Sequence, residues 1–264
     1  MAQAPDMPPA AEPLIQALSA PAHWQAVDFV SDLHLCEAMP RTYAAFAAHL
    51  AHTSADAVFI LGDLFEVWVG DDMADLAFER DCLSVMRAAS SGLHLGFMLG
   101  NRDFLAGARM LELGGATGLS DPTLFNAWGR NVLLSHGDAL CLADAPYQEF
   151  RAMVRSAAWQ STFLARPLAD RMHIAAQIRQ ASQGRRQFDG ASDADADVAL
   201  ALKWLQQSGA EVLVHGHTHR PGTNALAPGR LRHVLSDWDL DQGQRAEVLR
   251  MTRAGFERMA PSGN

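Results

Sequence analysis

Five short apolar runs, each followed directly by a cluster of polar residues, constrain the fold of this chain more than any other feature. Apolar runs of this length, bounded by turn residues, are typical of strands in a sheet covered on both faces. The runs are Ala26–Val30, Ala57–Leu61, Leu93–Leu99, Asn131–Leu134 and Glu211–Val214. Two later runs, Leu231–Leu235 and Ala246–Met251, are expected to form a terminal pair of strands.

Helical stretches lie between the first strands. Thr42–Ala51 and Asp75–Ala89 combine good helix formers with apolar residues at the helical spacing. Phe104–Leu113 is a shorter helix candidate that two glycines end. Strands that alternate with helices predict an α/β layered fold.

The stretch after the fourth run differs, because helical patterns follow one another there with no strand between them. We expect Ala145–Gly190 to be a helical insertion that covers the sheet edge or the active site. Within it, Gln183–Ala191 is polar and contains glycine, which favours a loop. Ser192 with Asp195 resembles a capping box, which predicts a helix from there through Leu205.

Composition indicates how many domains the chain forms and in which kind of cellular compartment it functions. Of 264 residues, 49% are apolar and 19% are charged, so we expect a loose tail, residues 1–22, and one globular domain, residues 23–264. Three cysteines without a pairing motif favour a reducing compartment. No apolar run is long enough to span a membrane. The net charge of -9 argues against nucleic-acid binding and therefore against a nuclease.

The polar clusters supply possible metal ligands. In chain order they contain Asp32, His34, Asp63, Asn101, Arg102, Asp103, His136, Asp138, His215, His217 and His219. Ligands gather beyond the carboxyl ends of strands in α/β sheets, so these groups are expected to meet there. Carboxylate and amide oxygens with imidazole nitrogens suit Mn²⁺, Fe or Zn²⁺ better than Ca²⁺. Each piece alone is more often structural, but five pieces in this order predict a two-metal phosphoesterase.

The motif order D-x-H, G-D, G-N-x-D, H-G-D, G-H-T-H resembles the calcineurin-like metallophosphoesterase superfamily. Longer strings resemble the UDP-2,3-diacylglucosamine diphosphatase family of Gram-negative bacteria, which acts in lipid A biosynthesis. These strings are Ser31–Cys36, Leu61–Asp72, Gly100–Leu105, His136–Cys141, His215–Pro221 and Asp144–Tyr147. The resemblance covers roughly Val27 to Leu240. It implies a layered sandwich whose helical insertion caps the active site.

The resemblance implies two Mn²⁺ sites. The first ion would be held by Asp32, His34, Asp63 and His219, and the second by Asp63, Asn101, His136 and His217. Asp63 would bridge the ions, and Asp63 and Arg102 would carry catalysis. The implied reaction is hydrolysis of UDP-2,3-diacylglucosamine to UMP and 2,3-diacylglucosamine 1-phosphate, with water attacking the phosphorus nearer uridine.

Substrate contacts also follow from the resemblance. They would come from Asn101, Arg102, Asp144, Ser182 and His217. The family uses an Asn and a Lys shortly after that serine, and by ungapped counting this sequence has Arg186 and Asp189 there. Neither contact is therefore transferred, and Arg185 or Arg186 is an alternative source of the positive charge.

The residue type at Arg102 bears on the substrate. Many superfamily members resemble G-N-H-E or G-N-H-D, in which the histidine can protonate an alkoxide leaving group. An arginine does not release a proton near neutral pH, but it stabilises phosphate charge through paired hydrogen bonds. Arg102 therefore favours a diphosphate, because a phosphate leaving group needs less protonation. The alternative is that Arg102 pairs with Asp103 for structure.

The predicted insertion is rich in arginine and in large apolar residues. Its arginines are Arg151, Arg155, Arg166, Arg171, Arg179, Arg185 and Arg186. Such a stretch could hold acyl chains and approach anionic lipid, whereas periodicity alone favours a helical hairpin packed on the sheet. The resemblance favours the first interpretation, and it implies a peripheral enzyme at the cytoplasmic face of the inner membrane.

Other functions stay open on the sequence. A nucleotide or nucleotide-sugar diphosphatase with soluble substrates would carry the same motifs and would need no acyl chains. A non-catalytic metal-bound binding module is a rival of another class. Such modules often lose ligands, whereas every expected ligand is present here. Neither nucleic acid nor an obligate protein partner is indicated.

Overall fold

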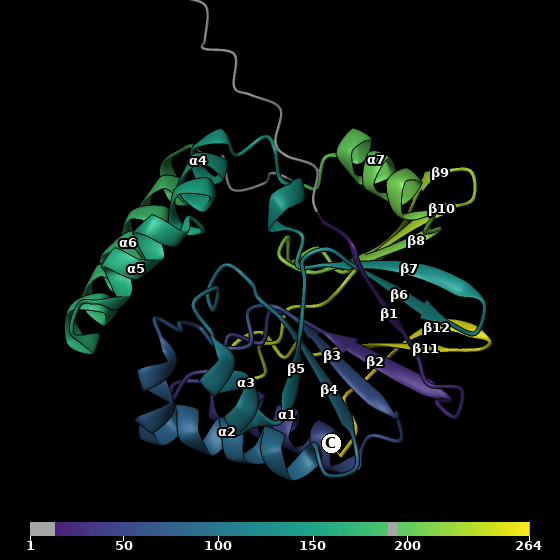
Figure 1. Cartoon of the computed structure of the whole chain (residues 1–264), viewed down its shortest axis with the longest axis horizontal. Helices are drawn as coiled ribbons and strands as arrows, with labels where there is room; N and C mark the ends of the chain where they lie inside the picture. The colour runs from purple at the N-terminus through teal and green to yellow at the C-terminus, as the bar shows by residue number, and fades with distance from the viewer. Residues whose placement is uncertain (1–13, 190–194, 264) are drawn as a thin grey trace, which may run out of the picture.

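The computed structural model describes residues 14–189 and 195–263, without the side chains of residues 182–189. Within these residues two six-stranded sheets face each other (Figure 1). Helices α1 (Pro40–His52), α2 (Ala77–Ala89) and α3 (Ala108–Gly114) cover the outer face of one sheet, and α7 (Val198–Ser208) covers the other. The insertion forms a separate helical group of α4 (Ala145–Val154), α5 (Ala157–Leu164) and α6 (Leu168–Asp189).

Parallel strands form the centre of each sheet. Sheet A has the order β1 (Gln16–Ser19), β6 (Thr123–Ala127), β7 (Arg130–Ser135), β8 (Val212–His215), β10 (Arg230–Val234) and β9 (Gly222–Ala227). Sheet B has the order β12 (Gly255–Met259), β11 (Val248–Thr252), β2 (Ala26–Val30), β3 (Ala57–Leu61), β4 (His94–Met98) and β5 (Ala116–Leu119). Strands β2 to β5 run parallel to one another, as do β7, β8 and β10, whereas β2, β7 and β10 each also pair with an antiparallel strand. Two short 3₁₀ helices, η1 (Asp71–Asp75) and η2 (Asp138–Leu140), complete the described elements.

The continuous apolar runs are explained by burial of both faces of each sheet. Along β3, Phe59 faces the core between the sheets, whereas Val58 and Ile60 face the core beneath α1 and α2. Aromatic rings join the two sheets, since Phe59 and Phe125 meet edge to face with centroids 5.1 Å apart. Side chains on both faces of these central strands are therefore removed from water, which favours apolar residues at most positions.

The five predicted strands and the α/β layered fold are confirmed, with bounds shifted by a residue or so. The predicted terminal pair of strands is wrong. Its members are β10 and β11, and they lie in different sheets: β10 pairs with β8 and β9, and β11 pairs with β2 and β12. Apolar periodicity identifies a strand but does not name its neighbour.

Three other expectations need correction. Gln16–Ser19, placed in a loose tail, forms β1 and pairs with β6, while residues 1–13 lie outside the described residues. The loop expected from Gln183 is helical as far as Asp189. Helix α7 starts at Val198, not at Ser192, which also lies outside the described residues.

The start of α7 has a clear physical cause. Both carboxylate oxygens of Asp195 accept hydrogen bonds from Arg232 at 3.0 Å, so this side chain is engaged with β10. Asp197 caps the helix instead, accepting from the backbone N–H of Leu200 at 2.7 Å. None of the helices within the described residues is both long and apolar enough to cross a membrane.

A buried ion pair fastens the C-terminal strands to the centre of sheet B. Asp28 on β2 is fully buried and lies opposite Arg250 on β11. Its oxygens accept from Arg250 Nε at 2.6 Å and Nη2 at 2.8 Å, and from the Thr53 hydroxyl at 2.6 Å. Burial raises the pKa of the Asp28 carboxyl, but the contacts with Arg250, His49 and Thr53 outweigh burial and lower it to about 2.

We predict that Asp28→Asn lowers the free energy of unfolding at pH 7 by about 2–4 kcal/mol, because it leaves Arg250 without its counter-charge. The folded-state pKa is below the unfolded value of 3.8. The stabilisation is therefore complete above that value and is lost as the pH falls through about 2. Urea unfolding from pH 7 to pH 2 measures it, and an undiminished difference at pH 2 would contradict the prediction. As a control, Asp75→Asn, in an exposed ion pair with Arg109, should leave stability nearly unchanged.

Candidate two-metal active site

The seven predicted metal ligands follow parallel strands and meet at one end of the two sheets. They are Asp32 and His34 after β2, Asp63 after β3, Asn101 after β4, His136 after β7, and His217 and His219 after β8. Three of these strands belong to sheet B and two to sheet A. The site therefore lies where the carboxyl ends of both sheets converge, as expected for an α/β fold.

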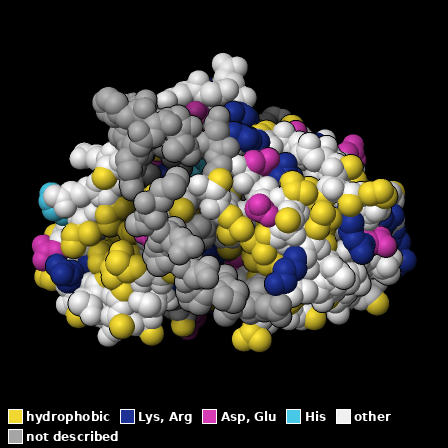
Figure 2. Space-filling model, turned by 90° about the horizontal axis from the view of Figure 1, so that it is seen from above, with side chains coloured by type: hydrophobic (Ala, Val, Ile, Leu, Met, Phe, Trp, Pro, Cys, Tyr) yellow, Lys and Arg dark blue, Asp and Glu magenta, His cyan; other side chains and the backbone are white. Residues whose placement is uncertain are grey.

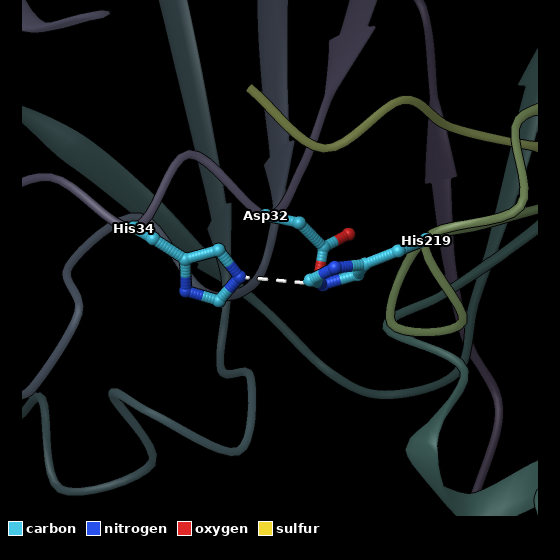
Figure 3. A group of neighbouring side chains, drawn as sticks. All are labelled: Asp32, His34 and His219. Atoms are coloured by element: carbon cyan, nitrogen blue, oxygen red, sulfur yellow. Dashed lines mark hydrogen bonds and ion pairs between the residues drawn. The ribbon is translucent and has the colours of Figure 1, made fainter. Parts of the chain in front are cut away.

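One group of ligand atoms consists of Asp32, His34 and His219, whose donor atoms lie within 4.8 Å of one another. The two imidazoles point toward each other, with 3.3 Å between their Nε2 atoms (Figure 3). Asp32 Oδ1 lies 3.4 Å from His219 Nε2, and it is buried without a hydrogen-bond partner among the described residues. Buried acceptors are normally paired, so this convergence of lone pairs fits a cation.

A second group consists of Asp32, Asp63 and His136, again within 4.8 Å. The Asn101 side-chain oxygen lies 3.0 Å from His136 Nε2 and 2.8 Å from His217 Nδ1. Asp32 belongs to both groups, and Asp63 Oδ1 lies 3.7 Å from His136 Nε2. The mixture of oxygen and nitrogen donors fits a pair of divalent transition-metal ions.

The ligands occupy an uncommon backbone conformation. Within the described residues, seven non-glycine residues have positive φ angles, and five of them are predicted ligands: Asp32, His34, Asp63, His217 and His219. Such residues cost on the order of 1 kcal/mol or more each and persist where surrounding structure enforces them. Here the backbone N–H of Asp32 donates to Gly62 O and that of His34 to Asp63 O, both at 3.1 Å. The strain is thus concentrated at the site and held by contacts between its loops.

Two glycines allow the ligand loops to approach each other. A Cβ atom built on Gly100 would overlap the carboxylate and the backbone nitrogen of Asp63. One built on Gly216 would overlap the Asp32 carboxylate and the Ser31 hydroxyl. Side chains at either position would therefore push apart the loops that carry the ligands.

Asp103 joins two ligand loops through backbone hydrogen bonds. Its carboxylate accepts from the N–H groups of Gly100 and Leu64 at 2.8 Å and of Asp63 at 3.3 Å. Burial, with the nearby charge of Asp63, raises the pKa of the Asp103 carboxyl to about 6. Arg102 Nη1 lies instead 3.7 Å from Glu66. The alternative that Arg102 pairs with Asp103 for structure is therefore wrong.

Comparisons with known proteins decide the family. A sequence profile of the calcineurin-like phosphoesterases matches residues 26–221. The chain belongs to this family. A UDP-2,3-diacylglucosamine hydrolase of Chromobacterium violaceum is 43% identical over 242 residues, which cover 90% of this chain and 100% of the relative. A protein of the same name from Stenotrophomonas maltophilia strain K279a is 41% identical over 247 residues, covering 86% of this chain and 95% of the relative.

The histidines His217 and His136 of this phosphoesterase differ in how readily they can bind a metal, because their pKa values are shifted in opposite directions. Burial, together with the neighbouring His136, lowers the pKa of His217 to about 4, which leaves its nitrogen lone pair free at neutral pH. For His136 burial lowers the pKa, but Asp63, Asp138 and Asp32 raise it to a net value of about 9. A bound cation would repel the extra proton of His136, so metal binding and proton release are coupled.

Sequence reasoning missed two carboxylates that face the outer nitrogens of the first histidine pair. Glu66 Oε2 lies 3.2 Å from His34 Nδ1, and Asp237 Oδ2 lies 3.5 Å from His219 Nδ1. Carboxylates in this place orient metal-binding histidines. Glu66 stands within the string Leu61–Asp72 that carries the resemblance. For neither residue does the distance in sequence from a histidine motif indicate this role. Only the tertiary structure places them.

Asp138 stands in one of the polar clusters that could supply metal ligands. It does not orient His136, whose Nδ1 lies 2.9 Å from the carbonyl oxygen of Leu61 and whose Nε2 lies 3.0 Å from the Asn101 side-chain oxygen. Asp138 instead accepts from the Tyr147 hydroxyl at 2.8 Å and from Arg151 Nε at 2.7 Å. It therefore binds the phosphoesterase core to helix α4, and Tyr147 was not recognised from the sequence as part of the site.

Other arginines of the insertion also bind the core. Arg155 donates to Gly100 O at 2.8 Å, Arg171 donates to Asp72 and to the carbonyl of Val69, and Arg179 lies 2.8 Å from Glu66. With Arg151, four of the seven arginines that we expected to approach anionic lipid are thus engaged with the core. Neutralising core carboxylates is a second use for the positive charge of this stretch.

The remaining predicted substrate contacts lie in the insertion. Asp144 caps helix α4 by accepting from the Tyr147 backbone N–H at 3.1 Å. The ring of Tyr147 in turn stacks on His217, with centroids 5.7 Å apart. Ser182 is within α6, and its side chain lies outside the described residues, as do those of Arg185, Arg186 and Asp189.

We predict that Gly100→Ala weakens Mn²⁺ binding by on the order of tenfold or more, because the new methyl group displaces Asp63. Isothermal titration calorimetry of metal-free protein measures the effect, and circular dichroism checks the fold. Gly92→Ala is the matched control, because a Cβ atom at Gly92 meets nothing within 4 Å. Equal affinities of the two variants would contradict the close approach seen at Gly100.

Proposed function

We propose that this phosphoesterase hydrolyses UDP-2,3-diacylglucosamine to UMP and 2,3-diacylglucosamine 1-phosphate, a step of lipid A biosynthesis. The observation that supports the proposal is that a cluster of predicted metal ligands and an apolar-rich insertion meet at one site. Seven predicted metal ligands converge beside Arg102, and an apolar-rich insertion contacts the same loops through Tyr147 and Arg155. The names of the relatives at 43% and 41% identity support the choice of substrate.

The donor set supports two divalent ions, and we propose Mn²⁺ for both. Asp32, His34, Asp63 and His219 would hold one ion, and Asp63, Asn101, His136 and His217 the other. When bound, such ions generate a hydroxide from water at neutral pH and neutralise phosphate charge. The chain itself positions the substrate: no side chain of the site needs to form a covalent intermediate.

Arg102 would orient the diphosphate and compensate its charge. Its backbone N–H donates to Asp63 Oδ1 at 2.8 Å, so the arginine is fixed to a metal ligand. Because a guanidinium keeps its proton, it suits a leaving group that departs as a phosphate. Asn101 would contact the same diphosphate, and His217, Asp144 and Ser182 would make further contacts with the substrate.

The loop Gly100–Leu105 connects phosphate chemistry with apolar binding. Phe104 follows Arg102 by two residues, and its ring lies 6.1 Å from that of Trp159 on helix α5. Trp159 stacks on Phe163 with centroids 4.5 Å apart. Aromatic and aliphatic residues beside the phosphate site are the surroundings that acyl chains need, and a soluble nucleotide sugar would not use them.

The Mn²⁺-loaded protein should cleave UDP-2,3-diacylglucosamine at least about a hundredfold faster, in kcat/KM, than UDP-N-acetylglucosamine, because remote binding energy from the acyl chains is used at the reacting phosphate. Mass spectrometry of UMP formation measures both rates. Reaction in H₂¹⁸O should place the label in UMP. Equal rates would instead assign the protein as a soluble nucleotide-sugar diphosphatase.

The control for this assay is Asp63→Ala, which should lose metal and nearly all turnover while remaining folded. A binding module without catalysis would show no turnover in either protein. Retained activity in the variant would show that the proposed ligand set is wrong.

We further propose that the protein binds the cytoplasmic face of the inner membrane through the insertion. Met153 on α4, Leu164 on α5 and Met172 on α6 are exposed, with 50%, 42% and 39% of their surface accessible. Figure 2 shows apolar side chains at the surface on the side where the insertion lies, and further ones across the rest of the same face. Exposed apolar groups on a basic helical stretch are typical of proteins that lie on a membrane surface.

Flotation with vesicles that contain anionic phospholipid tests this attachment. We expect the protein to float, and the variant with Met153, Leu164 and Met172 all changed to Ser to float several-fold less, because about 0.8 kcal/mol is lost for each buried CH₂ group removed. As a control, Leu231→Ser removes an exposed apolar residue on β10, outside the insertion. Equal flotation of the triple variant and the wild type would contradict the proposal.

A further inference from the structure

Glu66 is a largely buried carboxylate that contacts three parts of the site at once. It follows β3, and only 13% of its side chain is accessible to solvent. Oε2 lies 3.2 Å from His34 Nδ1. Oε1 lies 2.8 Å from Arg179 of helix α6 and 3.7 Å from Arg102. One oxygen thus faces the histidine, and the other faces two guanidinium groups.

Because one carboxylate oxygen of Glu66 faces His34 Nδ1, the carboxylate determines which nitrogen of the neutral His34 ring carries the proton. An ionised carboxylate beside Nδ1 favours an N–H at that nitrogen. The lone pair then resides on Nε2, which faces His219 and Asp32 at the centre of the first group of ligand atoms. The arginines at Oε1 fix the orientation of the carboxylate, because guanidinium groups can only donate.

We propose that Glu66 is a positioning residue that holds His34 in the tautomer with Nδ1 protonated and Nε2 free for the metal. It also retains Arg102 beside the site. The inference rests on the proposed function only in assigning a metal to His34. It adds that the insertion, through Arg179, reaches the same carboxylate that orients a metal ligand.

The isosteric variant Glu66→Gln gives an unusual prediction. A glutamine has one acceptor and one donor end, and Arg102 and Arg179 demand the acceptor. Its NH₂ group would therefore face His34 Nδ1, which would invert the tautomer and place the proton on Nε2. Glu66→Ala, which removes both ends, should leave a mixture of tautomers.

The experiment is long-range ¹H–¹⁵N NMR of metal-free protein labelled at histidine, at an alkaline pH where the His34 ring is neutral, with the His34 signals assigned by their absence in His34→Gln. Wild type should show Nδ1–H, and Glu66→Gln should show Nε2–H. Calorimetry should find Mn²⁺ binding about 10–100-fold weaker in Glu66→Gln. Excess Mn²⁺ should restore part of kcat. A residue with a merely structural role would not change the tautomer.

Asp75→Asn is the matched control, because it removes a carboxylate from an exposed ion pair near the same segment. Nδ1–H in Glu66→Gln and Glu66→Ala, with wild-type Mn²⁺ affinity, would overturn the inference. The experiment distinguishes a failure of the Glu66 inference from a failure of the proposed function. If wild type shows the tautomer and binds Mn²⁺ but does not cleave the acylated substrate, the proposed function fails and the role of Glu66 stands.

Discussion

The buried carboxylate of Asp32 is the interaction on which the rest of the site depends. Its Oδ2 accepts from the Ser31 hydroxyl at 2.5 Å and from the backbone N–H of His217 at 2.9 Å, so it joins the loop after β2 to the loop after β8. These loops arise from different sheets. An ionised carboxylate that is completely buried requires compensating charge. The converging histidines, and the cations that the donor set fits, supply it.

Acidic residues around the predicted metal ligands also require compensating positive charge. Glu66, Asp72 and Asp138 are acidic residues near the ligand loops, and each contacts an arginine of the insertion. Such pairs between partly buried groups are directional and fix the insertion in one place. The acidic core and the basic insertion therefore complement each other, although the chain as a whole is acidic.

The convergence of the candidate ligands could be predicted from the sequence because their signal is local. Each stands directly after an apolar run, and burial on both faces of the sheets makes those runs conspicuous. Glu66 and Asp237 carry no such signal, since their roles depend on which histidine nitrogen they approach in three dimensions. The surroundings of Asp195 likewise depend on tertiary structure, since its carboxylate pairs with Arg232, which is distant in sequence.

The contacts of the insertion also bear on how one site can serve a substrate with a charged and an apolar end. Four arginines of the insertion contact the core. The aromatic residue Trp159 of the insertion packs beside Phe104, which belongs to the loop that carries Asn101 and Arg102. Only three positions in the chain separate the predicted ligand Asn101 from the aromatic residue Phe104. A substrate that placed its diphosphate on the predicted ligands would therefore have its neighbouring groups close to these aromatic residues. Binding energy from an apolar tail can then act on the position of the phosphate, which is where it raises the rate.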